Sequence, residues 1–387
     1  MCNSLHRKVL QQSETSPFLR RKTRKVKIGD VEIGGGAPIS IQSMTKTDTK
    51  NVRATLAEIG DLAKAGCEIV RIAVKDISSL RPLKKIIDKS RLPVEVDIHF
   101  IPQLALGAID AGAAAVRLNP GNINREGDIK RILKSAKRSG IPVRIGVNSG
   151  SLAPPSGKYP AGVALKGGSV VDSMVKSALA YTKIFENVGF RDIMISLKSS
   201  SVPETIEAYR KMSVLCDYPF HLGITAAGPP TSATVKSAIG IGTLLEEGIG
   251  DTIRVSITGD PVCEVEVAKA ILSSLHLRRF GPEIISCPTC GRCQVDLVKI
   301  VGKLEQALSV ISYPRHRRVR LGRKLSAKGI TVAVMGCEVN GPGEAAHADM
   351  GIAAGKASGV LFKKGKIIKR IKERDFIKEI MKEISLC

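Results

Sequence analysis

The chain has 387 residues, more than one hydrophobic core usually fills, so we expect two domains. It has no apolar run near the roughly 20 residues of a membrane-spanning helix, and its nine cysteines are too sparse for a small disulfide-stabilised secreted scaffold. The net charge of +24 favours an anionic partner, but aromatic residues make up only 3% and Trp is absent, which leaves few platforms for stacking nucleic-acid bases. We therefore expect a cytoplasmic protein that binds neither membrane nor nucleic acid.

Two runs concentrate the positive charge. The first, Arg20–Lys27, belongs largely to a basic N-terminal arm over residues 1–23, and the second is PRHRRVRLGRK at Pro314–Lys324. We interpret both as solvated segments. A β-hairpin with the sequence KVKIGDVEIGG, turning at Gly29 and Asp30, should follow the arm and close the bottom of a barrel.

Short β-branched segments then alternate with stretches of helical periodicity. This alternation, repeated eight times, is typical of a (β/α)8 TIM-type barrel, which we place at residues 24–278. An open doubly wound sheet is the alternative, but no G-x-G-x-x-G motif follows the first strand. The expected strands are Ile39–Met44, Ile69–Val74, Val94–Phe100, Ala115–Pro120, Val143–Asn148, Ile193–Lys198, Phe220–Thr225 and Thr252–Ile257.

Charged residues interrupt these apolar strands: Arg71, Asp97, Arg117, Arg144, Lys198 and Arg254. A buried charge is costly unless it is paired or faces a ligand, and the carboxyl ends of barrel strands meet at one mouth. Five basic side chains against a single acid, Asp97, predict a pocket for a di-anion or a diphosphate. Neutral hydrogen-bonding groups expected at the same rim are His99, Asn119, Asn148 and Ser256.

The pattern changes beyond the barrel, and we predict a smaller α+β domain over residues 281–387. It contains Cys287, Cys290 and Cys293 in SCPTCGRCQVDL, and Cys337 in VMGCEVNGPGEA. A zinc ribbon normally uses two C-x2-C pairs, and a ferredoxin-type run needs a cysteine four residues after Cys293; neither pattern is present. Three thiolates with the nearby carboxylate of Glu344 remain as ligands of an iron–sulfur cluster, where the oxygen ligand would be the more readily exchanged.

Several motifs, in order, resemble the family of 4-hydroxy-3-methylbut-2-enyl diphosphate synthases of the methylerythritol phosphate isoprenoid pathway. They are PISIQSMT, VDIHF, RLNPGN, VRIGVNSGSL, HLGIT, CPTCGR and VMGCEVNGPGEA, and the resemblance runs from about Arg21 to the C-terminus. It implies a barrel joined to a [4Fe-4S] domain, in a homodimer where the cluster domain of one subunit closes over the barrel of the other. The plant form's extra domain is absent, which favours the bacterial type.

The resemblance also implies a reaction: reductive ring opening of 2-C-methyl-D-erythritol 2,4-cyclodiphosphate to 4-hydroxy-3-methylbut-2-enyl diphosphate. Reduced flavodoxin or ferredoxin, both commonly acidic, would supply two electrons. The implied cluster ligands are Cys287, Cys290, Cys337 and Glu344, with Cys293 as a neighbouring free thiol. The implied catalytic residues are Glu344, Asp97 and His99, and the implied substrate contacts are Arg71, Arg117, Asn119, Arg144, Asn148, Lys198, Arg254 and Ser256.

The chain also departs from the family pattern. Ala226, in ITAAG, stands where the family has a glutamate, Ser201 stands where it often has an aspartate, and residues 314–329 look like a basic insertion. The missing glutamate removes a candidate proton donor, so a family member of reduced activity is one alternative. The other is a zinc-containing basic protein that binds polyanions, which would be colourless.

Overall fold

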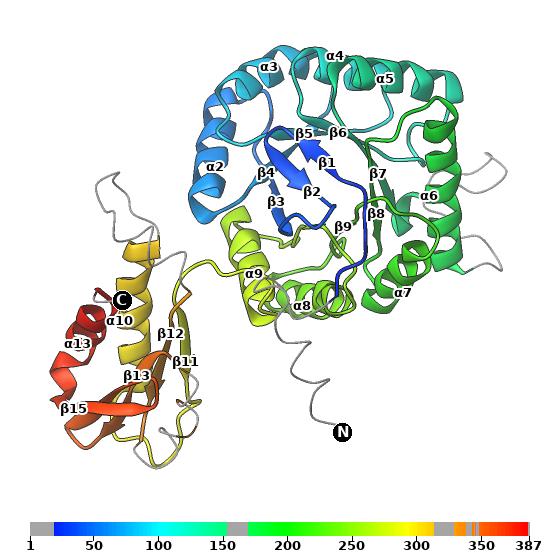
Figure 1. The fold of residues 1–387 in the computed structure, drawn as a ribbon. Helices are drawn as coiled ribbons and strands as arrows, with labels where there is room; N and C mark the ends of the chain where they lie inside the picture. Colours follow the sequence, from blue (N-terminus) through cyan, green and yellow to red (C-terminus); the bar gives the residue numbers. More distant parts are fainter. Residues whose placement is uncertain are drawn as a thin grey trace, which may run out of the picture. The chain divides into compact units, whose positions relative to one another are not determined.

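The computed structural model describes residues 19–152, 169–312, 329–337, 343, 345 and 348–385. Contacts divide the chain into two compact units after Arg278. The two units are drawn in Figure 1 and are considered one at a time. The boundaries expected from the sequence, 24–278 and 281–387, stay predictions.

The first unit is a ring of parallel strands in the order β8-β7-β6-β5-β4-β3-β10-β9. A parallel bridge between Ile195 and Phe220 nearly closes the ring between β8 and β9. The strands are β3 (Ser40–Met44), β4 (Ile69–Val74), β5 (Val94–Ile98), β6 (Ala115–Leu118), β7 (Val143–Asn148), β8 (Ile193–Lys198), β9 (His221–Leu222) and β10 (Thr252–Ile253). The expected (β/α)8 barrel is confirmed.

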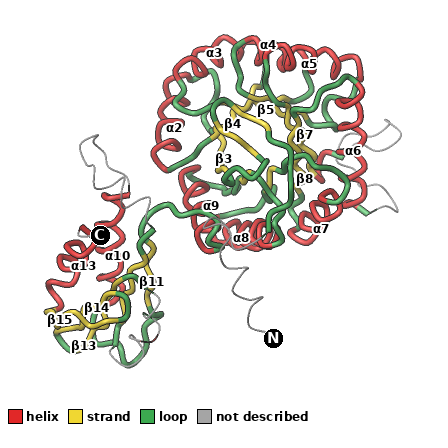
Figure 2. Tube along the Cα trace, in the orientation of Figure 1, coloured by secondary structure: helices red, strands yellow, loops and turns green. Residues whose placement is uncertain are grey.

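Helices surround the strand ring, as Figures 1 and 2 show. Each presents an apolar stripe to the strands, as Ile59 and Leu62 of the first helix illustrate. The helices are α2 (Val52–Ala65), α3 (Leu80–Lys89), α4 (Pro102–Asp110), α5 (Glu126–Ser139), α6 (Val170–Asn187), α7 (Val202–Ser213), α8 (Pro230–Glu246) and α9 (Pro261–Ser274). Two of them end at a glycine: Gly66 and Gly140 take the left-handed conformation directly after α2 and α5.

The last two strands of the ring are much shorter than expected, because β9 and β10 contain two residues each. After β9, Ala226 (φ 49°) and Gly228 (φ 104°) have positive φ, which an extended strand does not allow. After β10, the backbone N–H of Ile257 donates to the carboxylate of Glu264 in α9, at 3.1 Å. The expected strands Phe220–Thr225 and Thr252–Ile257 are therefore too long at their carboxyl ends.

The expected hairpin covers one end of the barrel. It consists of β1 (Val26–Ile28) and β2 (Val31–Ile33), paired antiparallel. Its apolar side chains form one cluster with Ile69, Ala115 and Met194, which lie at or next to the first residues of β4, β6 and β8. The hairpin therefore closes the amino-terminal end of the strands, and the opposite mouth is the one available for a site.

The described part of the basic arm is bonded to the barrel, so our interpretation of Arg20–Lys27 as solvated is wrong for its first two arginines. Arg20 donates to the carbonyl of Ala37 and to Asp251, at 2.6 and 3.1 Å. Arg21 donates to three backbone carbonyls and stacks over Phe220, with 4.0 Å from its guanidinium carbon to the ring centroid. These arginines fix the chain against the barrel.

The second unit is a five-stranded mixed sheet with helices packed on one face. The strands are β11 (Glu283–Ser286), β12 (Thr331–Met335), β13 (Met350–Gly355), β14 (Ser358–Lys363) and β15 (Lys366–Lys372), and the helices are α10 (Leu297–Ser312) and α13 (Phe376–Ser385). Strands β11, β12 and β13 run parallel, and β14 is antiparallel to both neighbours. Among the described residues of both units, no helix combines the length and apolar character needed to cross a bilayer.

The bonds of the arm yield a stability prediction. The buried carboxylate of Asp251 accepts hydrogen bonds from Arg20, from Thr23 at 3.0 Å and from the N–H of Phe220 at 2.9 Å. Because Asp251→Ala leaves these donors unpaired, we expect it to lower the free energy of unfolding by about 3 kcal/mol, as measured by urea denaturation. Asp88→Ala, which removes an exposed helix ion pair with Lys84, should cost less than about 1 kcal/mol. Equal losses in the two variants would contradict the role of Asp251.

Candidate active site

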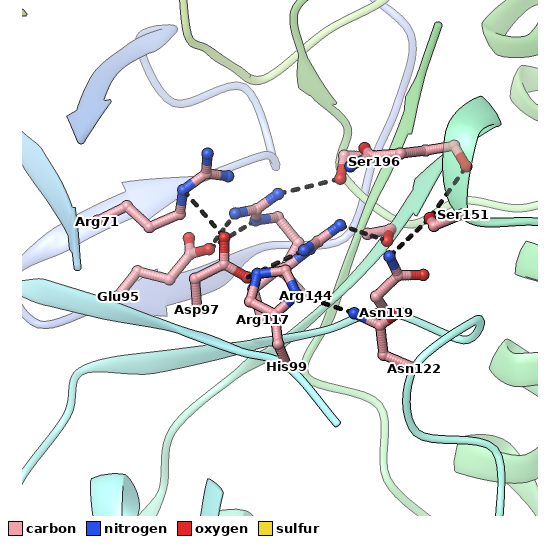
Figure 3. Close-up of polar contacts among 12 residues, drawn as sticks. Arg71, Glu95, Asp97, His99, Arg117, Asn119, Asn122, Arg144, Ser151 and Ser196 are labelled. Carbon is pink, nitrogen blue, oxygen red and sulfur yellow. Dashed lines mark hydrogen bonds and ion pairs between the residues drawn. The ribbon is translucent and has the colours of Figure 1, made fainter. Parts of the chain in front are cut away.

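The open mouth of the barrel brings together charged side chains from six strands or the segments that follow them. Figure 3 shows the central part of this cluster. Asp97 has the greatest number of charged neighbours: Arg117 donates to its Oδ1 at 3.0 Å, and the Nε atom of Arg71 lies 3.6 Å from its Oδ2. Burial alone would raise the pKa of Asp97, but the two guanidiniums outweigh it and hold the pKa far below the usual range. Asp97 is therefore a permanent anion that orients two cations.

His99 lies beside Asp97, as the sequence predicts. Its Nε2 atom is 3.6 Å from Asp97 Oδ1, and its Nδ1 atom is 2.8 Å from the side-chain amide nitrogen of Asn122. Since an amide nitrogen donates, Nδ1 is the acceptor and the ring proton lies on Nε2, facing the carboxylate. Burial lowers the pKa of His99, and Asp97 only partly opposes this. The imidazole is therefore neutral at pH 7.

The expectation of one acid among the strand cations is wrong, because Glu95 and Glu264 also lie among them. Glu95 belongs to the same strand as Asp97 and is fully buried. Arg144 donates to its Oε1 from Nε at 2.8 Å and also donates to Ser196 at 3.0 Å, so this guanidinium is bound within the barrel. Glu95 stands two residues before Asp97 in VEVDI, so both side chains lie on the same face of the strand. This spacing was the feature of the sequence that could have identified Glu95 as a second acid in the barrel.

Glu264 comes from helix α9 and not from a strand, so strand patterns could not identify it. Its oxygens accept from Ser43 Oγ at 3.0 Å and from the N–H of Ile257 at 3.1 Å. Arg254 and Lys46 lie 3.5 and 3.4 Å from it. The helix thus supplies a carboxylate that positions a cation at the mouth.

Even with three carboxylates, positive charge is in excess. Lys198 is buried and has no hydrogen-bond or ion-pair partner among the described residues. Burial, reinforced by the surrounding guanidiniums, lowers the pKa of Lys198 well below that of a free lysine. The Nε atoms of Arg117 and Arg254 are buried without an acceptor. Burial lowers the pKa of Arg71 to about 9, and nearby Arg254 adds to this. These unpaired donors fit a multiply charged anion.

His221 is a further buried group that the sequence analysis missed. It lies in β9 with no exposed surface, and both ring nitrogens are without partners among the described residues. Burial and the adjacent cations lower its pKa well below the usual value, so the ring is neutral. It begins the motif HLGIT, but neither its residue type nor its place in an apolar strand distinguishes it from an ordinary core histidine.

Two strand glycines make room for the cations. A Cβ atom at Gly146 would lie 2.2 Å from Arg117 Nε, and one at Gly223 would lie 2.7 Å from Lys198 Nζ. Any larger residue at either position would displace the cation, because such distances are below the closest contacts of carbon and nitrogen. The extended paths of Arg117 and Lys198 across the barrel thus depend on these glycines.

The other expected rim residues lie around the same mouth. The Asn119 side chain donates to Ser151 at 2.7 Å and accepts from the N–H of Gly121 at 3.0 Å, so it holds the loop after β6. Asn148 ends β7 and Ser256 follows β10, and both are half-buried. Ala226, where the resemblance implies a glutamate, is exposed in the loop after β9.

The cysteines belong to the second unit. Cys287 follows β11 and Cys337 comes two residues after β12; because these strands are parallel neighbours, both leave the sheet at one end. The N–H of Gly336 donates to Cys287 Sγ at 3.3 Å. Cys290 is exposed. Cys293 instead lies with its Sγ 3.2 Å from the carbonyl oxygen of Val295, to which it donates.

Glu344 and most of the expected insertion, residues 314–328, lie outside the described residues. Within the described ranges, no three His, Cys, Asp or Glu side chains are already gathered as a metal site. The donor chemistry nevertheless fits an iron–sulfur cluster, since it offers sulfur ligands from two loops at one end of a sheet.

Two family models match the chain. A GcpE TIM-barrel domain matches residues 23–269, and a GcpE protein C-terminal domain matches residues 283–386. The chain belongs to the GcpE family. The family expected from the sequence motifs is thereby confirmed, and a zinc-containing polyanion-binding protein is not favoured.

Curated members of the GcpE family resemble the chain over nearly its whole length. A protein of Clostridium perfringens (strain 13 / Type A) is 50% identical over 366 residues, covering 94% of this chain and 99% of the relative. One of Caldanaerobacter subterraneus subsp. tengcongensis is 50% identical over 367 residues, covering 95% and 97%. Both are named 4-hydroxy-3-methylbut-2-en-1-yl diphosphate synthase (flavodoxin). Among solved structures, a dihydropteroate synthase of Coxiella burnetii covers 65% of this chain and 98% of its own, with TM-score 0.46 and 13% identity.

The depressed pKa of Lys198 leads to a prediction about anion binding. A bound di-anion raises the pKa of a buried ammonium group. At a pH above the pKa of the free site, inorganic pyrophosphate should therefore bind together with up to about one proton, and its affinity should fall as the pH rises. Isothermal titration calorimetry in two buffers of different ionisation enthalpy measures this uptake.

The matched variants are Lys198→Met and Lys211→Met. Lys198→Met should bind pyrophosphate more weakly and without the proton uptake. Lys211→Met, which alters an exposed lysine paired with Asp172 on the outer helices, should retain both properties of the unaltered chain. Undiminished proton uptake in Lys198→Met would show that another group titrates.

Proposed function

We propose that the chain catalyses the reductive ring opening and dehydroxylation of 2-C-methyl-D-erythritol 2,4-cyclodiphosphate to 4-hydroxy-3-methylbut-2-enyl diphosphate, as the names of its relatives suggest. It is then an iron–sulfur oxidoreductase of isoprenoid precursor biosynthesis. The observation that carries the proposal is the excess of buried, unpaired cationic donors at the barrel mouth, in a chain whose second unit carries clustered thiols.

The cations at the mouth bind the cyclic diphosphate. Lys198 has no carboxylate partner among the described residues, and Arg71 and Arg254 are held only loosely, 3.6 and 3.5 Å from Asp97 and Glu264, so all three would bind a ligand with two phosphoryl groups. Arg117 is held by Asp97 and by the carbonyl of Gly146, at 2.7 Å. Donors fixed in advance by such bonds need no reorganisation when substrate charge shifts in the transition state.

The remaining rim residues complete the substrate pocket. Asn119, Asn148 and Ser256 supply neutral hydrogen-bonding groups. Arg144, which donates to Glu95 inside the barrel, adds positive charge next to the pocket. Asp97 and His99 are the catalytic pair that we propose: Asp97 stays ionised and orients the imidazole, whose Nε2 lies 3.6 Å from its Oδ1. Loss of the hydroxyl as water requires a proton, and His99 can deliver one after it has first taken one up, because the imidazolium form is the acid.

A [4Fe-4S] cluster would be held by Cys287, Cys290 and Cys337, with Glu344 as the fourth ligand. When bound, it would pass the two electrons of the reduction from the carrier to the substrate, one at a time. Flavodoxin is the electron donor that the relatives' names support. The family resemblance also supports a homodimer in which a barrel and a cluster domain from different subunits form one site. The cytoplasmic location stays a prediction.

Cysteine variants test the ligand set. We expect the anaerobically purified protein to be brown and to contain stoichiometric iron and acid-labile sulfide. Cys290→Ser should lose the colour and most of the sulfide, because it removes a soft thiolate ligand. Cys293→Ser should keep both, because that thiol bonds a backbone carbonyl. Loss of sulfide in Cys293→Ser, or its full retention in Cys290→Ser, would contradict the assignment.

Position 226 tests the departure from the family. A carboxylic acid that acts as a general acid or base is worth about 10²–10⁴ in rate, so we expect Ala226→Glu to raise kcat with the cyclic diphosphate at least tenfold. The glutamate enters an exposed position whose φ of 49° a non-glycine residue already occupies, so the fold should be unaffected. Ala226→Gln adds a side chain of the same size without the acid. Equal kcat in both variants would show that another group replaces the missing glutamate.

A further inference from the structure

A hollow in the second unit is lined by four cations, two acids and four apolar residues. It lies between α10 and the segment that leads from β15 through the short 3-10 turn η4 (Glu373–Asp375) into α13. Ile300, Ala357, Phe376 and Ile377 form its apolar part. The cations around it are Lys299, Lys303, Lys372 and Arg374, and we call it the basic hollow.

Strand register places the basic hollow at the same end of the sheet as the cysteines. Ser286, directly before Cys287, pairs with Val334, and Met335 pairs with Ala353. Two residues further along β13, Gly355 pairs with Ser358, and Ser358 in turn pairs with Lys372. Lys372 and the Lys356–Ala357 turn therefore lie at the same end of the sheet as the cysteine loops, where β11, β12 and β13 terminate. Helix α10 also starts there, four residues after Cys293.

The lysines of the basic hollow have no partners of opposite charge. Lys299, Lys303 and Lys372 are exposed, and none forms an ion pair with another described residue. Arg374 only approaches its neighbour Asp375, at 3.8 Å. One of the two acids in the hollow, Asp296, is occupied as the cap of α10, where it accepts from the N–H of Lys299 at 3.0 Å. Like charges left together on a surface repel one another unless a partner neutralises them.

The opposite end of the same sheet differs. A second hollow there is lined by Arg279, Lys363, Lys364 and Asp349. Its cations are partly neutralised, because Lys363 pairs with Glu383 at 3.2 Å. It also lies at the start of β12 and β13, a full strand length from the cysteine loops. Lys364 forms no ion pair with another described residue, so unpaired charge is present at both ends, but the larger group of unpaired lysines lies at the cysteine end.

We propose that the basic hollow is the docking surface for an acidic flavoprotein electron carrier of the flavodoxin type. This rests on the proposed function, which requires a protein donor of electrons. Complexes of electron carriers are small and transient, so one charged hollow with an apolar floor provides enough surface. Opposite charge speeds the encounter, and the exposed Ala357 and half-buried Ile377 supply apolar surface that the partner can cover.

The test reverses charge at one end of the sheet and uses the other end as control. Lys299→Glu with Lys303→Glu alters the basic hollow, and Lys364→Glu with Lys366→Glu makes the same change of net charge at the far end. A glutamate at 299 lies in the first turn of α10, where the helix dipole favours it, so this variant should fold. Iron and sulfide content verify that the cluster domain is intact.

Binding of an oxidised bacterial flavodoxin to each cluster-loaded protein is then measured by calorimetry at low and high salt. We expect Kd to rise at least about tenfold in the basic-hollow variant at low salt, with the difference shrinking as salt screens the charges. The control variant should bind within about twofold of the unaltered protein. Equal Kd in the basic-hollow variant, or an equal loss in the control, would overturn the proposal.

Turnover of the cyclic diphosphate separates this proposal from the proposed function. With reduced methyl viologen as the electron source, the basic-hollow variant should match the unaltered chain, whereas with reduced flavodoxin its KM for the carrier should rise. If the unaltered chain fails to turn over with viologen, the proposed function is wrong, and the binding measurement still decides whether the basic hollow recognises flavodoxin. If the basic-hollow variant turns over more slowly than the unaltered chain with reduced methyl viologen, its defect is not in flavodoxin docking and the proposal is overturned.

Discussion

The candidate site depends on an imbalance of buried charge in the barrel. Asp97, Glu95 and Glu264 each hold one or two cations, yet Lys198 and the Nε atoms of two arginines have no acceptor within the described part of the chain. Burying such groups costs free energy, which the rest of the barrel must supply in the absence of ligand. A bound di-anion removes this cost, so the same desolvation that destabilises the empty mouth strengthens anion binding.

The backbone is arranged to tolerate this imbalance. Gly146 and Gly223 leave space for two long cationic side chains inside the strand ring. Strands β9 and β10 stop early, which frees the N–H of Ile257 to bind the carboxylate of Glu264 instead of a neighbouring strand. The hairpin closes the other end, with Ile28 and Ile33 fully buried. The free-energy cost of buried charge is thus confined to the open mouth, and the apolar residues at the closed end stabilise the barrel.

Much of this arrangement could be predicted from the sequence. A charge inside an apolar strand is rare enough to mark Arg71, Asp97 and Lys198 as candidate site residues, and the closed ring of parallel strands brings them together inside the barrel. The compensating groups were harder to predict. Glu264 lies on a helix, where a carboxylate is ordinary, and His221 resembles any core residue. Arg20 and Arg21 lie in a basic run typical of solvated arms, and only tertiary contacts show that backbone carbonyls and Asp251 bind them.

The net charge of +24 therefore has several separate origins. Part of it, as in Arg20, is structural and already paired. Part of it lies in the barrel mouth, where it is buried and suits a small, doubly charged ligand. A further part lies around Lys299 and Lys372, where it is exposed and therefore screened by salt. Buried charge selects a ligand by tight, desolvated contact, whereas exposed charge attracts a large partner and releases it readily. An enzyme that takes electrons one at a time from a mobile carrier needs both kinds, and this chain places them in different units.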